Sequence, residues 1–293
     1  MTVFFQYLVN GIVIGGTYSL IGMGMTLIFG IMRIVNFAHG EFYMLGAYFL
    51  YTLWAILGLN PVLSMLFTFV LILFLGIGFE QLFLRPLRKE SSTSSMLMTI
   101  GFLIVLQNAA LLIWGGATQT VPTLVDLKTF SIGDVVFSTD RILVFLISLT
   151  IIIFTSLFIG RTKTGRSMRA TFQDMEAAEV VGVNIERVYS ITFGFGAALA
   201  AAGGFLLAPL FVISPTMGAL ATSKAFAVVT AGGLGNVRGA ILGGLLLGVV
   251  ESLGAGYIAS GYKDAFGYLI IILVILFKPE GLMSRKRKKG VHA

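Results

Sequence analysis

GRTKTGRSMRATFQDMEAAEVVGVNIERVYS, residues 160–190, is the longest polar stretch between two apolar runs of this chain. Charged side chains are too costly in hydrocarbon to occur at this density inside a membrane. The stretch therefore predicts a loop at a membrane surface, called here loop 161–190. Its charged residues are Arg161, Lys163, Arg166, Arg169, Asp174, Glu176, Glu179, Glu186 and Arg187.

A short helix is predicted within this loop. Thr171 followed by Asp174 resembles a capping box, and Gly182 is typical of a helix end. Between these signals, apolar side chains recur at three- and four-residue spacing, so we expect an amphipathic helix over residues 172–182. A short amphipathic helix held between two membrane spans presents a surface that a partner outside the membrane can grip.

The composition places the whole chain in a membrane. Hydrophobic residues make up 57% of the 293 residues, charged residues only 11%, and the mean hydropathy is +0.97, whereas soluble domains are about one quarter charged. Continuous apolar runs of about 18 to 25 residues match a bilayer core and favour helices over alternating barrel strands. The first run lacks a basic leader and a cleavage signal, so we expect a retained span. Without cysteine, neither a disulfide nor a thiolate metal site can form.

These runs predict an all-α, polytopic membrane helix bundle of about eight or nine spans, forming a single domain over residues 1–293. The run 217–235 is the weakest, because it contains Lys224 and ends at a glycine-rich break, so it either spans or re-enters. Broken helices are expected there and around residues 33–41. The expected helical runs are 5–29, 41–58, 62–84, 96–114, 141–160, 190–212, 217–235, 239–257 and 263–278.

The net charge of +7 is concentrated beside the spans. Most basic residues lie in 85–95, in loop 161–190 and in 278–293, which the positive-inside rule assigns to the cytoplasm. The C-terminus, with its basic tail 279–293, is therefore expected in the cytoplasm and against anionic lipid. No aromatic-basic module indicates nucleic acid. The loop 115–140 suits the outer side, with a short hairpin over 129–138. The side of the N-terminus depends on whether 217–235 crosses.

Polar residues within spans are candidates for a translocation pathway. Asn36 and His39 lie at a helix break, where capping the helix end and contacting a solute are equally open roles. Glu41 can pair with Arg33, and Glu80 is expected at the interface, a turn from Arg85. Glu251 has no neighbouring cation in sequence and either pairs across helices or belongs to the pathway. Asn236 precedes a glycine-bearing span as Asn36 does, a faint sign of an internal repeat. The candidate pathway residues are Asn36, His39, Glu41, Asn236 and Glu251.

No catalytic constellation occurs in the sequence. There is no HExxH, no G-x-S-x-G and no P-loop, and the 2 histidines cannot build a metal site alone. We therefore expect no enzyme activity and no metal or cofactor in this chain, with any energy supplied by another subunit.

Several stretches resemble the branched-chain amino-acid permease family of ATP-binding-cassette importers. Glu176-Ala-Ala178 followed by Gly182 fits the E-A-A-x-x-x-G pattern of importer permeases. The other resembling stretches span nearly the whole chain and are most similar to the shorter, H-type subunit. They are Asn36-Phe-Ala-His-Gly40-Glu41, Leu45-Gly46-Ala47-Tyr48, Gly165-Arg-Ser-Met-Arg-Ala170, Gly182-Val-Asn184, Gly232-Gly-Leu-Gly-Asn236 and Phe277-Lys-Pro-Glu-Gly281-Leu282.

The resemblance implies a permease in the inner membrane of a bacterium or archaeon. Its partners would be a homologous M-type permease, two cytoplasmic ATPases that carry ATP and Mg, and an extracytoplasmic binding protein that delivers branched-chain amino acids. The helix 172–182 would then be a coupling helix that moves as a rigid lever. Residues implied to contact the ATPases are Arg169, Asp174, Glu176, Ala177, Ala178 and Gly182.

Three alternatives remain open at this point. Relatives within the same family carry urea or short amides. A stand-alone secondary carrier would use His39, Glu41 and Glu251 for protons, and a non-transporting scaffold could also present the polar helix.

Overall fold

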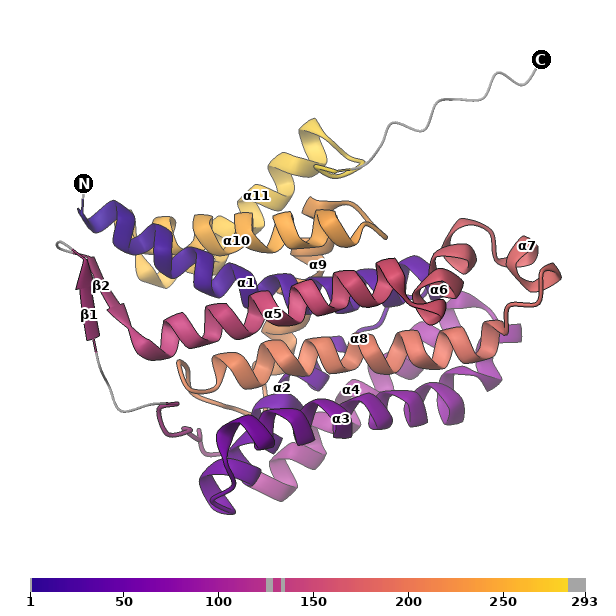
Figure 1. The fold of residues 1–293 in the computed structure, drawn as a ribbon, viewed down its shortest axis with the longest axis horizontal. Coiled ribbons are helices and arrows are strands. Elements are labelled where there is room, and N and C mark those ends of the chain that lie inside the picture. The colour runs from indigo at the N-terminus through magenta and orange to yellow at the C-terminus, as the bar shows by residue number, and fades with distance from the viewer. Residues whose placement is uncertain (1, 125–128, 133–134, 284–293) are drawn as a thin grey trace.

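A computed structural model describes residues 2–124, 129–132 and 135–283 of the chain. Residues 284–293 of the basic tail, which are expected to lie against lipid, fall outside the described residues. Each expected apolar run forms a helix (Figure 1). In chain order the helices are α1 (Thr2–Met32), α2 (His39–Leu50), α3 (Pro61–Phe79), α4 (Ser92–Trp114), α5 (Thr139–Arg161), α6 (Lys163–Gln173), α7 (Met175–Val180), α8 (Ile185–Leu207), α9 (Met217–Gly232), α10 (Val237–Tyr257) and α11 (Lys263–Phe277).

Shorter elements extend or join these helices. π-Helical turns continue α2 over Tyr51–Ile56 and α3 over Glu80–Leu84, and 3-10 turns occupy Pro86–Lys89 and Ser260–Tyr262. The expected hairpin is confirmed: β1 (Thr129–Ile132) pairs antiparallel with β2 (Val135–Ser138). Figure 1 shows this hairpin at the opposite end of the bundle from α7.

Among the described residues, 7 helices are long and apolar enough to cross a membrane. The two expected runs outside this set are those of α2 and α9, which have 12 and 16 residues. Helix α9 is about 24 Å long, less than the roughly 30 Å hydrocarbon core, and α2 reaches about 27 Å only with the π-helical turns that continue it to Ile56. Nearly all of α2 is buried inside the bundle, and both helices lie where the sequence predicted broken helices. The estimate of eight or nine spans is therefore approximate, because it counts α2 and α9.

Helix α1 crosses α10 at a seam of glycines. A Cβ atom on Gly11 would lie 2.6 Å from the Cα of Val249, and one on Gly248 would lie 2.4 Å from the backbone nitrogen of Gly15. The two backbones are therefore too close for any side chain at these positions. This is the close approach that small residues four apart allow in membranes.

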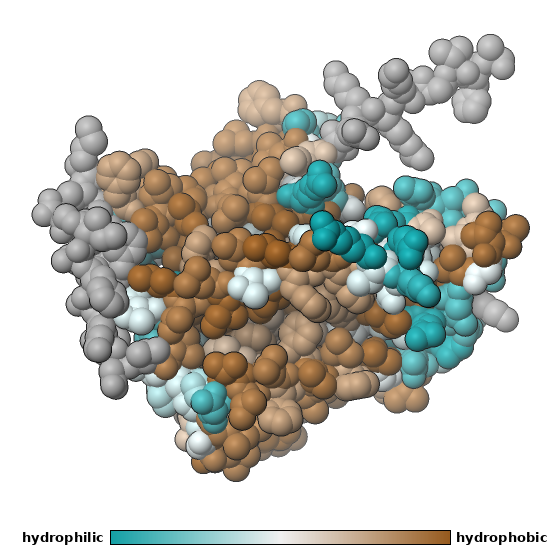
Figure 2. All heavy atoms as spheres, viewed as in Figure 1, coloured by the Kyte–Doolittle hydropathy of each residue, from teal (hydrophilic) through white to brown (hydrophobic). Residues whose placement is uncertain are grey.

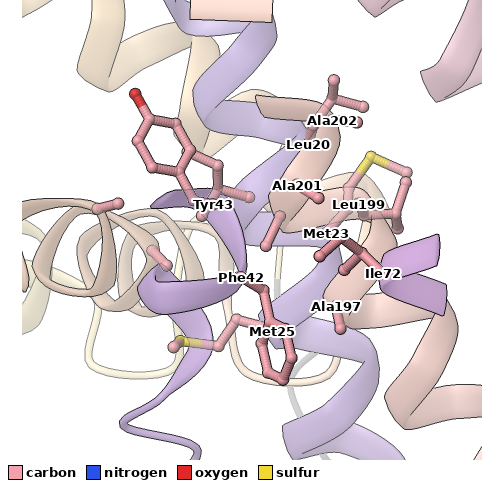
Figure 3. Packing of buried hydrophobic residues seen from close by; sticks show 14 of the residues in the cluster. Leu20, Met23, Met25, Phe42, Tyr43, Ile72, Ala197, Leu199, Ala201 and Ala202 are labelled. Atoms are coloured by element: carbon pink, nitrogen blue, oxygen red, sulfur yellow. The ribbon is translucent and has the colours of Figure 1, made fainter. Parts of the chain in front are cut away.

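The buried core lies where α1, α2 and α8 meet, with α3 alongside. Figure 3 shows Leu20 and Met23 of α1 beside Phe42 of α2, Ile72 of α3 and Leu199 of α8. Phe42 and Leu199 are fully buried. Helix α8 presents a run of alanines to this core, so its neighbours pack close to its backbone.

The outward faces of several helices are apolar. Side chains on α4 such as Leu112 and Ile113 are mostly exposed, and α5 and α11 likewise bury little of their surface. Figure 2 shows hydrophobic side chains over the flanks of the bundle, while hydrophilic ones gather at the end that carries α6 and α7. Apolar flanks with a polar end are the surface that a bilayer and its aqueous boundary require.

Candidate functional site

Loop 161–190 contains two short helices rather than one. The prediction of a single helix over 172–182 is wrong at its start, because Thr171 lies inside α6 and its hydroxyl donates to the carbonyl of Ser167. Helix α6 begins earlier, where the hydroxyl of Thr162 accepts a hydrogen bond of 3.0 Å from the backbone of Gly165. The sequence did not predict this helix, because basic side chains on its outer face mask the periodicity of its buried positions, Gly165 and Met168.

Asp174 separates the two helices. Its backbone is extended, with φ −154° and ψ 109°, and its carboxylate caps α7 by accepting from the backbone of Ala177 at 3.0 Å. An aspartate in that position stops one helix and starts the next. The predicted end of the helix at Gly182 is confirmed, because Gly182 adopts φ +87° and its backbone donates to the carbonyl of Glu179.

Helix α7 is exposed over most of its surface. Ala178 is buried, whereas Glu176 and Ala177 are exposed. Val180 and Val181 follow with 86% and 77% of their surface exposed. Exposed aliphatic side chains beside acidic ones form a small amphipathic face, which is typical of a protein contact. These residues lie at the polar end of the molecule (Figure 2).

The loop is fastened to the bundle at both ends. Arg169 of α6 donates to the carbonyl of Ile159 near the end of α5, which satisfies one of the carbonyls that a helix end leaves unpaired. A Cβ atom on Gly165 would lie 2.3 Å from the same carbonyl oxygen, so α6 folds tightly back on α5. At the other end Asn184 caps α8 by accepting from the backbone of Arg187 at 2.9 Å.

Glu80 ties the start of α8 to the end of α3. The expectation of an interfacial Glu80 near Arg85 is wrong, because Glu80 is fully buried and pairs with Arg88. Ser190 of α8 donates a second hydrogen bond to this carboxylate. Arg88 also lies 4.6 Å from the ring centre of Tyr189, and Arg85 instead pairs with Glu186. The contacts of Arg88 and Ser190 were not predicted from the sequence, because their shared partner, Glu80, belongs to a different helical element.

The polar residues at the start of α2 are buried among backbone groups. Asn36 accepts from the backbone of Ala38 at 3.1 Å, and His39 donates from Nε2 to the carbonyl of Ile21 at 2.9 Å. Among the described residues no ion pair involves Glu41, so it does not pair with Arg33. It accepts from Gln107 at 3.2 Å, and its carboxylate occupies the space where a side chain on Gly218 would lie. Asn36 therefore holds the turn that precedes α2, while the N-cap position of that helix is Ala38, with no side-chain cap.

Asn236 is the N-cap of α10. Its side-chain oxygen accepts from the backbone of Gly239 at 3.1 Å, and its amide donates to the carbonyl of Met283 at 3.0 Å. The C-terminal segment after α11 is thereby held against the turn between α9 and α10. The two asparagines of the faint repeat therefore make different local contacts, since Asn36 bonds the backbone two residues on and does not cap α2.

Glu251 lies in a network of charges that joins α1, α9, α10 and α11. It is 1% exposed and pairs with Lys224 of α9, which also contacts Asp264 at 2.7 Å. Tyr18 of α1 donates to Glu251 at 2.9 Å, and Lys263 lies 4.0 Å away. The cross-helix partner expected for Glu251 is therefore Lys224. This pairing could not be predicted from the sequence, because the two residues are 27 positions apart on different helices.

The candidate pathway residues do not share one cavity. A cavity of about 800 Å³ opens at the α6–α7 end, and Asn236 lines it. Asn36 lines a separate cavity of about 30 Å³, whereas neither cavity is lined by His39, Glu41 or Glu251. Within the described ranges no group of three or more His, Cys, Asp or Glu side chains is arranged to hold a metal ion.

Comparison with known proteins gives a consistent family. The profile of the family described as "Branched-chain amino acid transport system / permease component" matches residues 7–275. The high-affinity branched-chain amino acid transport system permease protein BraD of Pseudomonas aeruginosa is 39% identical, with 98% of each chain covered. The corresponding permease protein LivH of Escherichia coli K12 is 33% identical, with the same coverage. In fold, the chain is similar to the solved PsaBC structure from Streptococcus pneumoniae (TM-score 0.52, 13% identity, 96% and 93% of the two chains covered).

Proposed function

The chain belongs to the branched-chain amino acid transport permease family, and on that premise we propose that it is the transmembrane permease subunit of an ATP-binding-cassette importer for branched-chain, hydrophobic amino acids. The family is one of transport permeases, not of enzymes. The relatives named above are components of branched-chain amino acid transport systems, which supports the choice of solute.

The proposal includes the rest of the importer. An extracytoplasmic binding protein delivers the amino acid, a homologous M-type permease completes the pathway, and two cytoplasmic ATPases bind ATP and Mg. This chain itself carries no cofactor. The protein lies in the inner membrane of a bacterium or archaeon, with the α6–α7 end and the C-terminus in the cytoplasm.

The observation that carries the proposal is the exposed face of α7 on a firmly fastened loop. Val180 and Val181 together with Glu176 offer an amphipathic surface to an ATPase. The two-helix unit α6–α7 then takes the place of the single lever expected from the sequence. Arg169, Asp174, Ala177, Ala178 and Gly182 shape or hold that unit, and Glu176 contacts the partner.

Motion of this unit reaches the membrane through its two ends. Helix α5 is coupled to α6 by the contact of Arg169 with Ile159. Helix α8 is coupled to α3 through Glu80, Arg88 and Ser190. Closure of the ATPases would therefore tilt α5 and α8 together with α3 and switch access between the two faces.

Two substitutions in the loop test the coupling. Gly182→Pro is incompatible with the φ of +87° at this position, and Glu176→Lys reverses a charge on the exposed face. In the reconstituted complex we expect both variants to insert normally and to lose solute-stimulated ATP hydrolysis.

Glu90→Lys is the matched control, because Glu90 is exposed and lies outside loop 161–190. It should keep stimulated hydrolysis. Normal stimulation in both loop variants, with the ATPases still bound, would contradict the role of α7.

The solute is tested in proteoliposomes that contain the whole importer. We expect uptake of labelled leucine, isoleucine and valine that requires ATP, with urea and acetamide failing to compete. Competition by urea would instead indicate a permease for urea or short amides. Uptake by this chain alone, driven by a proton gradient, would indicate a secondary carrier.

A further inference from the structure

Three arginines converge on the 800 Å³ cavity at the α6–α7 end. Arg33 follows α1, Arg169 lies on α6, and Arg238 lies in the first turn of α10. The described residues that line the cavity include no aspartate or glutamate. The cavity is therefore a concentration of positive charge that the lining itself does not neutralise.

Two of these guanidinium groups are available to a ligand. Arg169 is engaged with the carbonyl of Ile159, whereas no ion pair within the described residues involves Arg33 or Arg238. Arg33 also adopts φ +56°, a left-handed conformation that is uncommon for any residue except glycine. Such strained backbone is often found at ligand sites.

Further groups in the cavity suit a negatively charged ligand. Thr26 is among the lining residues and is 1% exposed, and its buried hydroxyl has no hydrogen-bond partner. The cavity also borders the N-terminus of α10, a helix of 21 residues, where Asn236 accepts from the N–H groups of Gly239 and Ala240 and those of Val237 and Arg238 precede them. Such N–H groups and the helix dipole favour an anion.

The rest of the lining is mixed: Gln173 and Asn236 are polar, and part of the apolar lining belongs to membrane spans. Leu27 and Ile31 of α1 and Ile159 of α5 face the cavity. Arg33 follows α1 and Arg238 begins α10, two helices long and apolar enough to cross a membrane, so we expect both arginines at the depth of the lipid headgroups. A ligand that fits must therefore combine an anionic group with an apolar part. Basic pockets between spans on the cytoplasmic side are suited to anionic phospholipids.

We propose that this cavity binds the headgroup of an anionic phospholipid, with its phosphate between Arg33 and Arg238 and its glycerol and upper acyl chain against α1 and α5. The proposal rests on the proposed function for its cytoplasmic orientation. Because Met168 and Phe172 of α6 line the same cavity, the bound lipid connects the coupling loop to α1 and α10. Coupled ATP hydrolysis is then expected to depend on anionic lipid.

The binding test uses the importer purified in nanodiscs that contain phosphatidylcholine with or without phosphatidylglycerol. Native mass spectrometry of the released permease counts the phosphatidylglycerol that it retains. We expect Arg33→Gln/Arg238→Gln to lower retention about tenfold to thirtyfold, since each basic residue near an anionic headgroup contributes about 1 kcal/mol. Arg33→Lys/Arg238→Lys keeps the charge and should retain the lipid. If the neutral double variant fails to insert, the two single Gln variants are used, each with a severalfold loss.

The matched control is Arg161→Gln/Lys163→Gln, which removes the same charge from residues that do not line the cavity. It should retain phosphatidylglycerol as the unmodified chain does. Equal losses in the control and in the cavity variants would overturn the proposal, because the attraction would then be general. Displacement of all retained lipid by inorganic phosphate, with phosphate bound in its place, would assign the cavity to free phosphate and would also overturn it.

Stimulated ATP hydrolysis in the same discs separates this inference from the proposed function. We expect phosphatidylglycerol to raise it severalfold in the unmodified complex and not in Arg33→Gln/Arg238→Gln. If the ATPases never associate, the proposed function fails while the retention measurement still decides the lipid site. Loss of ATPase binding in the cavity variants with unchanged lipid retention would show that an acidic partner side chain fills the cavity, against the proposal.

Discussion

Removing the positive charge of Lys224 should destabilise the bundle. Glu251, its partner, is 1% exposed and Lys224 itself is 11% exposed, so Lys224→Met leaves a carboxylate buried without its closest cation. Breaking a buried pair in this way costs about 3 to 5 kcal/mol. We expect a loss near the lower end of this range, because Tyr18 still donates to Glu251 and the ammonium of Lys263 remains 4.0 Å from its carboxylate.

The assay is thermal denaturation of the purified permease in detergent. For a chain of this size, with an unfolding entropy of about 2.1 cal/mol/K per residue, a loss of about 3 kcal/mol corresponds to a fall in Tm of roughly 5 °C. Lys224→Met/Glu251→Gln removes both charges and should recover most of that fall. Lys263→Met is the control: its longer contact and 29% exposure predict a loss of about 1 kcal/mol or less.

Two results would refute this reasoning. One is a Tm for Lys224→Met that equals that of the unmodified chain. The other is a double variant less stable than Lys224→Met, since the two substitutions would then act independently. Amino acid uptake by the importer that carries the stable double variant is expected to continue, which would exclude Glu251 as a proton carrier.

Other predictions follow from packing and from the loop. Gly204→Val should prevent folding, because even a Cβ there would lie 1.9 Å from the carbonyl oxygen of Tyr43, whereas Gly101→Ala, in open space, should leave the yield of folded permease unchanged. Gly182→Ala should weaken α7 by about 1 to 2 kcal/mol because of its positive φ, seen as faster proteolysis of loop 161–190 in the isolated permease. Arg88→Met should leave the buried carboxylate of Glu80 without its cation. We expect it to lower stimulated ATP hydrolysis by a larger factor than it lowers membrane insertion, as measured by hydrolysis per inserted complex.

The membrane helices were predictable because hydrocarbon permits few structures. Nine apolar runs became nine helices, since backbone groups in lipid must bond within a helix. The helix end at Gly182 was also readable, because few residues other than glycine adopt a positive φ. The break at Asp174 was harder to predict, because the same residue types that cap a helix also occur inside one, and tertiary contacts of Gly165 and Met168 decide between these roles.

The contacts between distant residues could not be predicted from one sequence. Lys224 and Glu251 are 27 positions apart on different helices, and Glu80 meets Ser190 across 110 positions. Local sequence signals did better: Asn236 caps α10, whereas Asn36 bonds the turn before α2 without capping it. The meeting of Arg33, Arg169 and Arg238 around one cavity depends on the arrangement of α1, α6 and α10, which hydropathy does not encode.

The central position of α1 has a consequence for biogenesis. This helix is made first, yet the two helices that pack against it most, α8 and α10, lie in the second half of the chain and are translated later. Its glycine seam, Gly11 and Gly15, can close only when residues beyond 240 have entered the membrane. During synthesis α1 therefore remains beside the insertion machinery or in lipid, with the glycine surface that later contacts α10 still exposed. A chain truncated before α10 should for that reason be recognised by quality-control proteases as unfinished, even with most of its helices already inserted.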